Sequence, residues 1–325
     1  MKIFCLVAII LMYFLSPFRM EVLAKETDLK VRIATGSLTG VYYSAGNAIC
    51  RVLERRYGKR TDCQVLETGG TGSNLTLLTD GQVDLAIAQA DILLSPASTS
   101  GKQTVADANG IKALATLYPE VFQIVVRRGL GVTRALDLVN HRSNLGLPNT
   151  GTRQTINGLL RALNMSIDDF KHPLAISSSR DLDAFCNGEI DAFAFIAGVP
   201  NGKIALALER CGGDIVGFIR KANAAYVRAT PGVDFFRFRR SSYPQMDKTV
   251  DTFAISAMLV ARQDMDATKV RRILGALLDE MPYFSGMHPA WSDISIISMA
   301  GHHETGLMHK AARAEYLDRR ILPSR

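Results

Sequence analysis

The chain has 325 residues, of which 47% are hydrophobic and 21% charged, and its formal net charge is +7. These values are typical of globular proteins and exclude a disordered, collagen-like or coiled-coil chain. The length favours two lobes over one small core. An apolar run over residues 3–15 is too short to anchor the chain stably across a bilayer, which excludes a polytopic membrane protein.

The first 24 residues have the pattern of an export signal. Lys2 precedes the apolar run, Ser16-Pro17 interrupts it, and Val22-Leu23-Ala24 offers small or modest side chains to a signal peptidase. We therefore expect cleavage near Ala24, a periplasmic location, and a folded part that begins near residue 28. An uncleaved anchor is the alternative.

Four cysteines remain after such a cleavage: Cys50, Cys63, Cys186 and Cys211. An even number in an exported chain favours disulfides, and three pairings are possible. The simplest, local pairing is Cys50–Cys63 with Cys186–Cys211, each bond contributing about 3 kcal/mol. Four buried free thiols are the alternative. No C-x-x-C spacing is present, so we expect no metal site of that kind.

Basic residues cluster at 51–60 and 237–240 without the pattern of a nucleic-acid site. The first cluster falls on the solvent face of a predicted helix whose opposite face is apolar. The sequence contains no recognised nucleic-acid-binding motif. We expect solvated basic faces and no nucleic-acid partner.

Strands and helices alternate along the chain, which predicts an α/β fold with mostly parallel pairing and helices packed on the sheet. Strands are expected at residues 31–34, 63–67, 83–88, 121–127, 145–147 and 252–261, and helices to about Tyr57, to about Asp80, after Arg153 and over 266–281. The chain crosses twice between lobes, so we expect a cleft between them. The predicted domains are a signal peptide (1–24), lobe I (25–128), lobe II (129–249) and a return segment of lobe I (250–325).

Three glycine-rich turns, at 36–40, 69–73 and 149–153, each follow a predicted strand and precede a predicted helix. A helix N-terminus leaves backbone N–H groups unpaired and carries a partial positive charge, and glycine lets a ligand approach it. Three such turns converging on one cleft predict an anion site that needs no metal or cofactor. For any one turn, the alternative is that Gly and Ser serve only as turn and cap residues.

Catalytic and nucleotide-binding patterns are absent from the sequence. The turn at 69–73 lacks the third glycine of a dinucleotide fingerprint, and no G-x-S-x-G elbow is present. His302-His303-Glu304 and His309 do not have the H-E-x-x-H spacing of a zinc protease. We expect a binding protein without a cofactor. An exported enzyme, with Glu67 or Asp91 as general base, is the alternative.

Eight segments in order carry a resemblance to a known family: residues 34–43 (ATGSLTGVYY), 67–75 (ETGGTGSNL), 84–91 (DLAIAQAD), 151–153 (GTR), 188–192 (GEIDA), 198–202 (GVPNG), 288–291 (HPAW) and 309–312 (HKAA). Together they resemble the TAXI-type solute receptors of the TRAP transporter system, over essentially all of the chain after the signal. Leu38, residues 148–150 and Lys310-Ala311 depart from the family's usual residues.

The resemblance implies a two-lobe periplasmic-binding fold of type II-like organisation. It implies closure on an anionic solute such as glutamate, 2-oxoglutarate or a related dicarboxylate, and delivery of that solute to a TRAP-type membrane permease. A sensory receptor that presents its ligand to a membrane kinase is the alternative. We expect a monomer.

The expected ligand-binding residues are Gly36, Ser37, Thr39, Gly40, Tyr42, Gly70, Thr71, Ser73, Gln89, Asp91, Asn149, Thr152 and Arg153. A ligand carboxylate is expected over the helix that follows the first turn, with Thr152 and Arg153 reaching across from lobe II. A guanidinium can grip a carboxylate through two parallel charge-assisted hydrogen bonds. The alternative leaves Arg153 on the helix surface, paired with Asp181 or solvent. Whether Tyr42 or Tyr43 faces the cleft stays open.

Overall fold

A computed structural model describes residues 28–97, 103–132, 135–218, 224–301 and 306–323. The predicted export signal and the cluster His302-His303-Glu304 lie outside these residues. Within the described ranges, no helix has the length and apolar character needed to cross a membrane.

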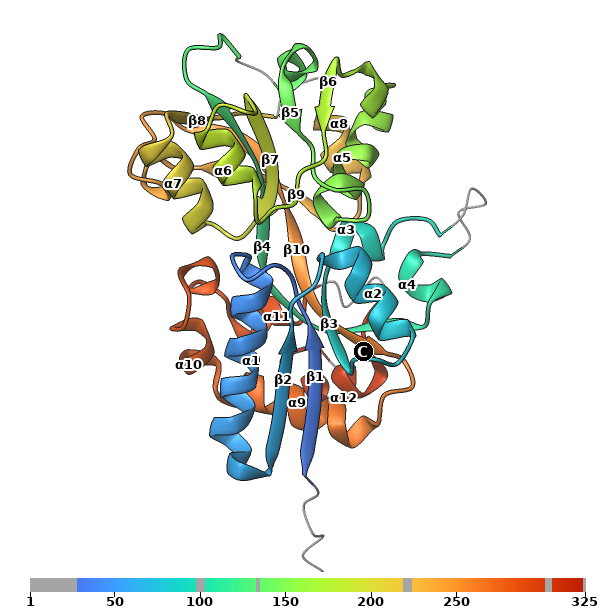
Figure 1. Cartoon of the computed structure of the whole chain (residues 1–325). Helices are drawn as coiled ribbons and strands as arrows, with labels where there is room; N and C mark the ends of the chain where they lie inside the picture. Colours follow the sequence, from blue (N-terminus) through green and yellow to red (C-terminus); the bar gives the residue numbers. More distant parts are fainter. Residues whose placement is uncertain (1–27, 98–102, 133–134, 219–223, 302–305, 324–325) are drawn as a thin grey trace, which may run out of the picture.

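Lobe I begins with parallel strands that are each followed by a helix (Figure 1). Strands β1 (Leu29–Ala34), β2 (Thr61–Leu66) and β3 (Leu85–Gln89) pair in the order β2-β1-β3. Helices α1 (Val41–Tyr57), α2 (Thr71–Thr79) and α3 (Ala90–Leu93) follow them, with η2 (Gly58–Arg60) after α1 and α4 (Val105–Ala108) before the next strand. Helix α1 buries Ala45, Ile49 and Val52, which recur three or four residues apart on one face.

Two long strands, β4 (Ile111–Arg127) and β10 (Val250–Arg262), run antiparallel through both lobes (Figure 1). β10 pairs with β3 over 257–261 and with β9 (Val233–Phe238) over 250–255. β4 pairs with β7 (Ala192–Ala197) over 121–126. Partners therefore change near residue 120 of β4 and residue 256 of β10. The domain boundaries after residues 128 and 249 stay a prediction. The change of partners favours a crossing point, at which the chain goes from one lobe to the other, within β4 and within β10 and not at their ends.

Lobe II continues the sheet from β4 in the order β4-β7-β5-β6, with β8 (Gly213–Val216) also paired to β4. Its other elements are η3 (Ala135–Asn140), β5 (Arg142–Asn144), α5 (Gly151–Ala162), η4 (Ile167–Asp169), β6 (His172–Leu174), α6 (Asp181–Cys186), α7 (Gly202–Arg210), α8 (Ala224–Ala229) and η5 (Arg240–Ser242). The strand predicted at 145–147 is wrong by three residues. Gly146 has φ +82°, in the left-handed region, so the extended chain ends at Asn144.

After β10 the chain packs back on lobe I through α9 (Ala267–Asp279), α10 (Met281–Ser285), η6 (Pro289–Trp291), α11 (Ile296–Met299) and α12 (Lys310–Asp318). The helix predicted over 266–281 ends at Asp279, and a separate short helix with Pro282 in its first turn follows.

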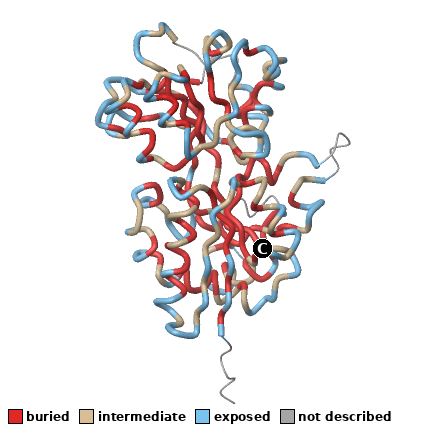
Figure 2. The backbone as a smooth tube through the Cα atoms, viewed as in Figure 1, coloured by how far each residue is buried: buried red, intermediate tan, exposed pale blue. Residues whose placement is uncertain are grey.

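The strand order β2-β1-β3-β10-β4 inserts a late strand between early parallel ones. Buried residues occupy the middle of each lobe (Figure 2). In β7, Phe193 and Phe195 join one buried cluster while Ala194 and Ile196 join another, because helices cover both faces of the sheet. The predicted α/β, two-lobe fold of type II-like organisation is confirmed.

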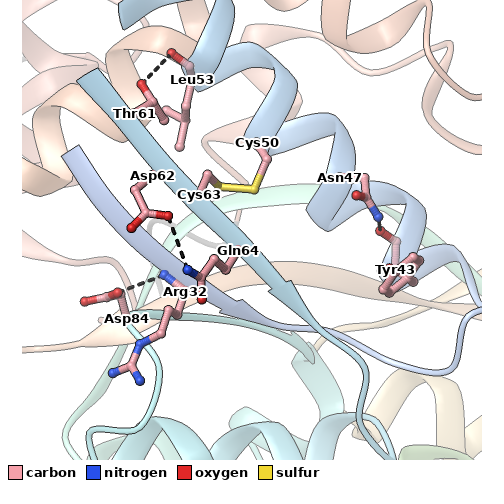
Figure 3. The surroundings of a disulfide bond; sticks show 10 residues. All are labelled: Arg32, Tyr43, Asn47, Cys50, Leu53, Thr61, Asp62, Cys63, Gln64 and Asp84. Carbon is pink, nitrogen blue, oxygen red and sulfur yellow. Dashed lines mark hydrogen bonds between the residues drawn. A yellow bond between two sulfur atoms is a disulfide. The ribbon is translucent and has the colours of Figure 1, made fainter. Parts of the chain in front are cut away.

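Both predicted disulfides are present. Cys50–Cys63 ties the middle of α1 to β2, with Cα atoms 5.4 Å apart (Figure 3). Cys186–Cys211 joins the ends of α6 and α7, with Cα atoms 4.8 Å apart. Each bond links a helix to an element that packs beside it, so each restrains one lobe and not the cleft.

The Cys50–Cys63 bond closes a short loop, so its loss should act mainly on the unfolded chain. The double variant Cys50→Ser/Cys63→Ser is expected to lower the free energy of unfolding by about 3 kcal/mol in urea titrations. Peptide mapping of the wild type under non-reducing conditions is the control. Four free thiols, or any link between Cys63 and Cys186, would contradict the assignment.

Candidate functional site

A cavity of about 230 Å³ lies between the two lobes. Lobe I lines it with the turns before α1 and α2, the end of β3, and Glu120 of β4. Lobe II lines it with the loop between β5 and α5, residues 176–179 and β7. The wall therefore needs both lobes in their present arrangement.

The structure brings eight of the predicted site residues to this cavity: Gly36, Ser37, Gly40, Tyr42, Gly70, Thr71, Gln89 and Thr152. Five others do not line it: Thr39, Ser73, Asp91, Asn149 and Arg153. Thr39 and Asn149 are exposed on their loops, and Asp91 is buried behind the wall. Tyr42, and not Tyr43, is the tyrosine that faces the cavity.

Two helices begin at the cavity with glycine at the N-cap. The N-caps of α1 and α2 are Gly40 and Gly70, and neither helix has a side-chain cap. Helix α5 differs, because the Thr150 hydroxyl caps it by accepting from the Arg153 N–H. Uncapped first turns leave N–H groups for a ligand, and the helix dipole favours a negative one.

A buried carboxyl forms part of the cavity wall. The Tyr42 hydroxyl donates to Oε2 of Glu120 at 2.6 Å and lies 3.4 Å from Oγ1 of Thr71. Burial, reinforced by nearby Asp91, raises the pKa of Glu120 to about 8, although the bond from Tyr42 opposes the shift. Glu120 is therefore mostly protonated and uncharged at neutral pH.

A chain of hydrogen bonds joins the lobes behind the cavity. The Thr155 hydroxyl of lobe II donates to Oδ2 of Asp91 at 2.6 Å and accepts from Nε2 of Gln89 at 3.1 Å. Burial raises the pKa of Asp91 to about 6, while the bonds from Thr155 and the Ile92 N–H oppose the shift. Asp91 thus fastens one lobe to the other and does not reach the cavity.

Arg153 does not enter the cavity. Its guanidinium donates to the carbonyl oxygens of Leu145 at 3.0 Å and Leu174 at 3.5 Å, which holds the β5–α5 loop against β6. The alternative prediction, in which Arg153 pairs with Asp181, is also wrong, because the Asp181 carboxylate is bound to Lys203.

The Asp181–Lys203 pair supports the lobe II wall. Nζ of Lys203 lies 2.9 and 3.0 Å from the two Asp181 oxygens, donates to the Ser178 carbonyl at 3.1 Å, and stands 3.4 Å from the ring centre of Phe195. Both charged groups are buried. Sequence reasoning missed this pair. The signal was the serine run 177–179 after β6 and before α6, a fourth strand–turn–helix junction.

Among the described residues, the cavity wall carries carboxyl groups at Glu67, Glu120 and Asp181 but no Arg, Lys or His. An anion bound here would therefore be held by backbone N–H groups, hydroxyls and the protonated Glu120, and not by a side-chain cation.

Comparison with known protein families matches residues 33–317 to the NMT1-like family. Similar solved structures include a Bordetella bronchiseptica RB50 protein, with 15% identity, TM-score 0.54, and coverage of 91% of this chain and 83% of that one. An ancestral arginine-binding protein bound to arginine has 12% identity, TM-score 0.51, and coverage of 82% and 99%. The alkanesulfonate-binding protein SsuA from Xanthomonas axonopodis pv. citri, bound to MOPS, has 14% identity, TM-score 0.47, and coverage of 92% and 96%. Likeness at these identities concerns the fold.

The buried Glu120 predicts an unusual dependence of stability on pH. Its folded pKa of about 8 lies above the ordinary value of 4.5, so the folded state binds the proton more tightly. Its contribution to stability should therefore fall as pH rises between these two values. Thermal midpoints from about pH 5 to about pH 9 should show the Glu120→Gln variant gaining on the wild type as pH rises. Glu67→Gln, at the exposed rim, is the control, and parallel curves for wild type and Glu120→Gln would contradict the assignment.

Proposed function

The chain belongs to the NMT1-like family, and from this premise we propose that it is an extracytoplasmic receptor that captures a small solute between its lobes. The observation that carries the proposal is a cavity lined by both lobes, at which two helices begin with glycine at the N-cap position and no side-chain cap. A receptor of this kind needs a pocket of N–H groups and hydroxyls, and a connection that lets the lobes separate. It transports its solute and does not transform it.

The proposed solute is a small anion such as glutamate, 2-oxoglutarate or a related dicarboxylate. One carboxylate lies over the start of α1, against the backbone at Gly36 and Gly40 and the Ser37 hydroxyl. Thr71 and Thr152 complete the contacts from the two lobes. A cavity of about 230 Å³ is smaller than the roughly 300–1,000 Å³ pockets of drug-sized ligands, which favours a solute of few atoms.

We place the receptor in the periplasm, and the proposed recipient of its solute is a TRAP-type membrane permease. The support for this step is the ordered resemblance to TAXI-type receptors from residue 34 to residue 312. A receptor that presents the same ligand to a membrane kinase is the second candidate, supported by the same cavity.

Glycine at position 151 is needed for the lobes to meet. A Cβ there would overlap the side-chain oxygen of Gln89 and come within 3.2 Å of Oγ1 of Thr71. Gln89 cannot easily move aside, because it is buried and bonded to Thr155 of the opposite lobe. Alanine at this position should therefore hold the cleft open. Gly158 lies in the same helix, and the nearest atom to its added Cβ is the Tyr226 hydroxyl at 3.9 Å.

The pair Gly151→Ala and Gly158→Ala tests the proposal. Calorimetry of the wild type against a panel of amino and dicarboxylic acids should identify a bound anion. At 100 times its dissociation constant, that anion should raise the free energy of unfolding by about 2.7 kcal/mol, which a thermal-shift assay detects. Gly151→Ala should weaken that binding by at least about 10-fold, because the closed state becomes less populated. Gly158→Ala should bind like the wild type. No binding by any acid of the panel, or equal affinities of the two variants, would contradict the proposal.

A further inference from the structure

Helix α3 of lobe I lies against helix α5 of lobe II at the junction of the lobes (Figure 1). The Asp91 carboxylate, in α3, accepts from the Thr155 hydroxyl of α5 at 2.6 Å. Both side chains are buried, and neither lines the cavity. Because this hydrogen bond joins the two lobes, it exists only while they are closed.

Further hydrogen bonds connect this contact to the cavity wall. Nε2 of Gln89 donates to the Thr155 hydroxyl at 3.1 Å, and Oε1 of Gln89 accepts from the Thr71 hydroxyl at 3.4 Å. The Thr71 hydroxyl lies 3.4 Å from that of Tyr42, which donates to Glu120. Thr71, Tyr42 and Glu120 line the cavity, so the wall and the contact between the lobes form one network.

The network has a carboxyl group at each end, Glu120 and Asp91, and none of its members is a cation. On the outer side, Asp91 lines a groove with Arg161 of α5 and Tyr226 of α8. Arg161 is exposed and forms no ion pair with Asp91 in the described parts of the chain, and the Tyr226 phenol stays neutral because burial and Asp91 raise its pKa. Closure therefore buries the ionised form of Asp91 without a cation, which is unfavourable.

Separation of the lobes changes the surroundings of Asp91. In the closed arrangement burial raises the pKa of Asp91 to about 6, although the bonds from Thr155 and the Ile92 N–H oppose the shift. When the lobes part, water reaches the carboxyl and its pKa returns toward the ordinary value of 3.8. The closed state thus binds the proton more tightly, so this contribution to closure is greatest below about pH 4 and is lost as the pH rises through about 6.

We propose that Asp91 and Thr155 are positioning residues that set how readily the lobes close around the solute, and that protonation of Asp91 favours closure. The Thr155 hydroxyl stabilises the closed state, whereas the charge of Asp91 destabilises it. A solute that needs the closed state binds in proportion to the population of that state, so two residues that do not touch the solute set its affinity. Control of closure requires no solute, whereas control of affinity rests on the proposed function.

Closure can be measured without a solute by cysteine trapping. The hydroxyl oxygens of Ser37 in lobe I and Ser178 in lobe II lie 3.4 Å apart, so cysteines at both positions can form a disulfide only while the lobes are closed. The rate of this cross-link, with diamide as the oxidant, reports the closed population even when it is small. On the Ser37→Cys/Ser178→Cys background, Thr155→Val should slow the cross-link by about 10-fold, as expected for the loss of a hydrogen bond to a charged group.

Two further variants on the same background are the controls. Thr155→Ser keeps the hydroxyl and should cross-link at the rate of the background protein. Thr230→Val removes a hydroxyl at the same groove that bonds to the Tyr226 carbonyl within lobe II, and it should also leave the rate unchanged. Equal rates for Thr155→Val and Thr230→Val, or a slow cross-link in Thr155→Ser, would overturn the role of Thr155.

The Asp91→Asn variant tests the proton. The rate of the background protein, divided by that of Asp91→Asn, should fall by about 4-fold from about pH 5.5 to about pH 7.5. The thiol chemistry is common to both proteins, and only the background protein loses a proton at position 91. A ratio that is constant, or that rises with pH, would overturn the role of the Asp91 proton.

Calorimetry with the acid that binds the wild type extends the test to affinity. Thr155→Val should weaken binding by about 10-fold, whereas Thr230→Val should bind like the wild type. Equal affinities of these two variants, together with a slow cross-link in Thr155→Val, would overturn the control of affinity. If no acid binds the wild type, the proposed function fails, and the cross-linking rates alone decide the control of closure.

Discussion

The antiparallel pair of β4 and β10 is the constraint on which the arrangement of the lobes depends. The two strands stay bonded from Val121–Ala254 to Ile111–Arg262, while each has different outer neighbours in the two lobes. The lobes can therefore change their angle only by bending or twisting this pair. Register shifts after Ala257 and Leu259 lie close to residue 256, where β10 goes from one lobe to the other. Irregularities of this kind increase the local twist of the strands.

The same strand pair positions the cavity between the lobes. Glu120, which lines that cavity, is a buried residue in the part of β4 where the lobes join. A change in the angle between the lobes would thus alter the cavity, because it is not built from one lobe alone.

The cavity between the lobes is compatible with the proposed anion in spite of its acidic residues. Its lobe I wall consists largely of helix starts with glycine at the N-cap and no side-chain cap, and burial raises the pKa of Glu120 to about 8, which favours its uncharged form at neutral pH. The charge of Lys203 is already matched by Asp181. Hydrogen bonds from fixed N–H groups can hold a carboxylate without a strong fixed charge, which keeps capture reversible.

Local sequence patterns predicted much of the fold. The apolar spacing in α1, the glycine turns before α1 and α2, and the short cysteine loops each depend on residues close together in the chain. The alternation of strands and helices predicted the α/β class, and the length and the two crossings predicted two lobes. The type II-like organisation was implied by the resemblance to TAXI-type receptors.

The missed features depend on contacts between distant segments. Glu120 was visible as a lone acid within the apolar run 117–126, but its place in the cavity depends on β4 crossing from lobe to lobe. Arg153 lies in the first turn of α5, which begins at Gly151 and not after Arg153 as predicted. Its side chain turns to the carbonyls of Leu145 and Leu174, which face it because β5 ends earlier than predicted. Asp91 meets Thr155 only because the lobes close.

The most direct test of the account is the change in shape on binding. Small-angle X-ray scattering should be recorded on the mature wild-type protein alone and at saturation with the acid that calorimetry identifies. The account predicts that the radius of gyration decreases on saturation, because the lobes of the free protein separate and the solute draws them together around β4 and β10. An unchanged radius of gyration at proven saturation would contradict closure of the cleft.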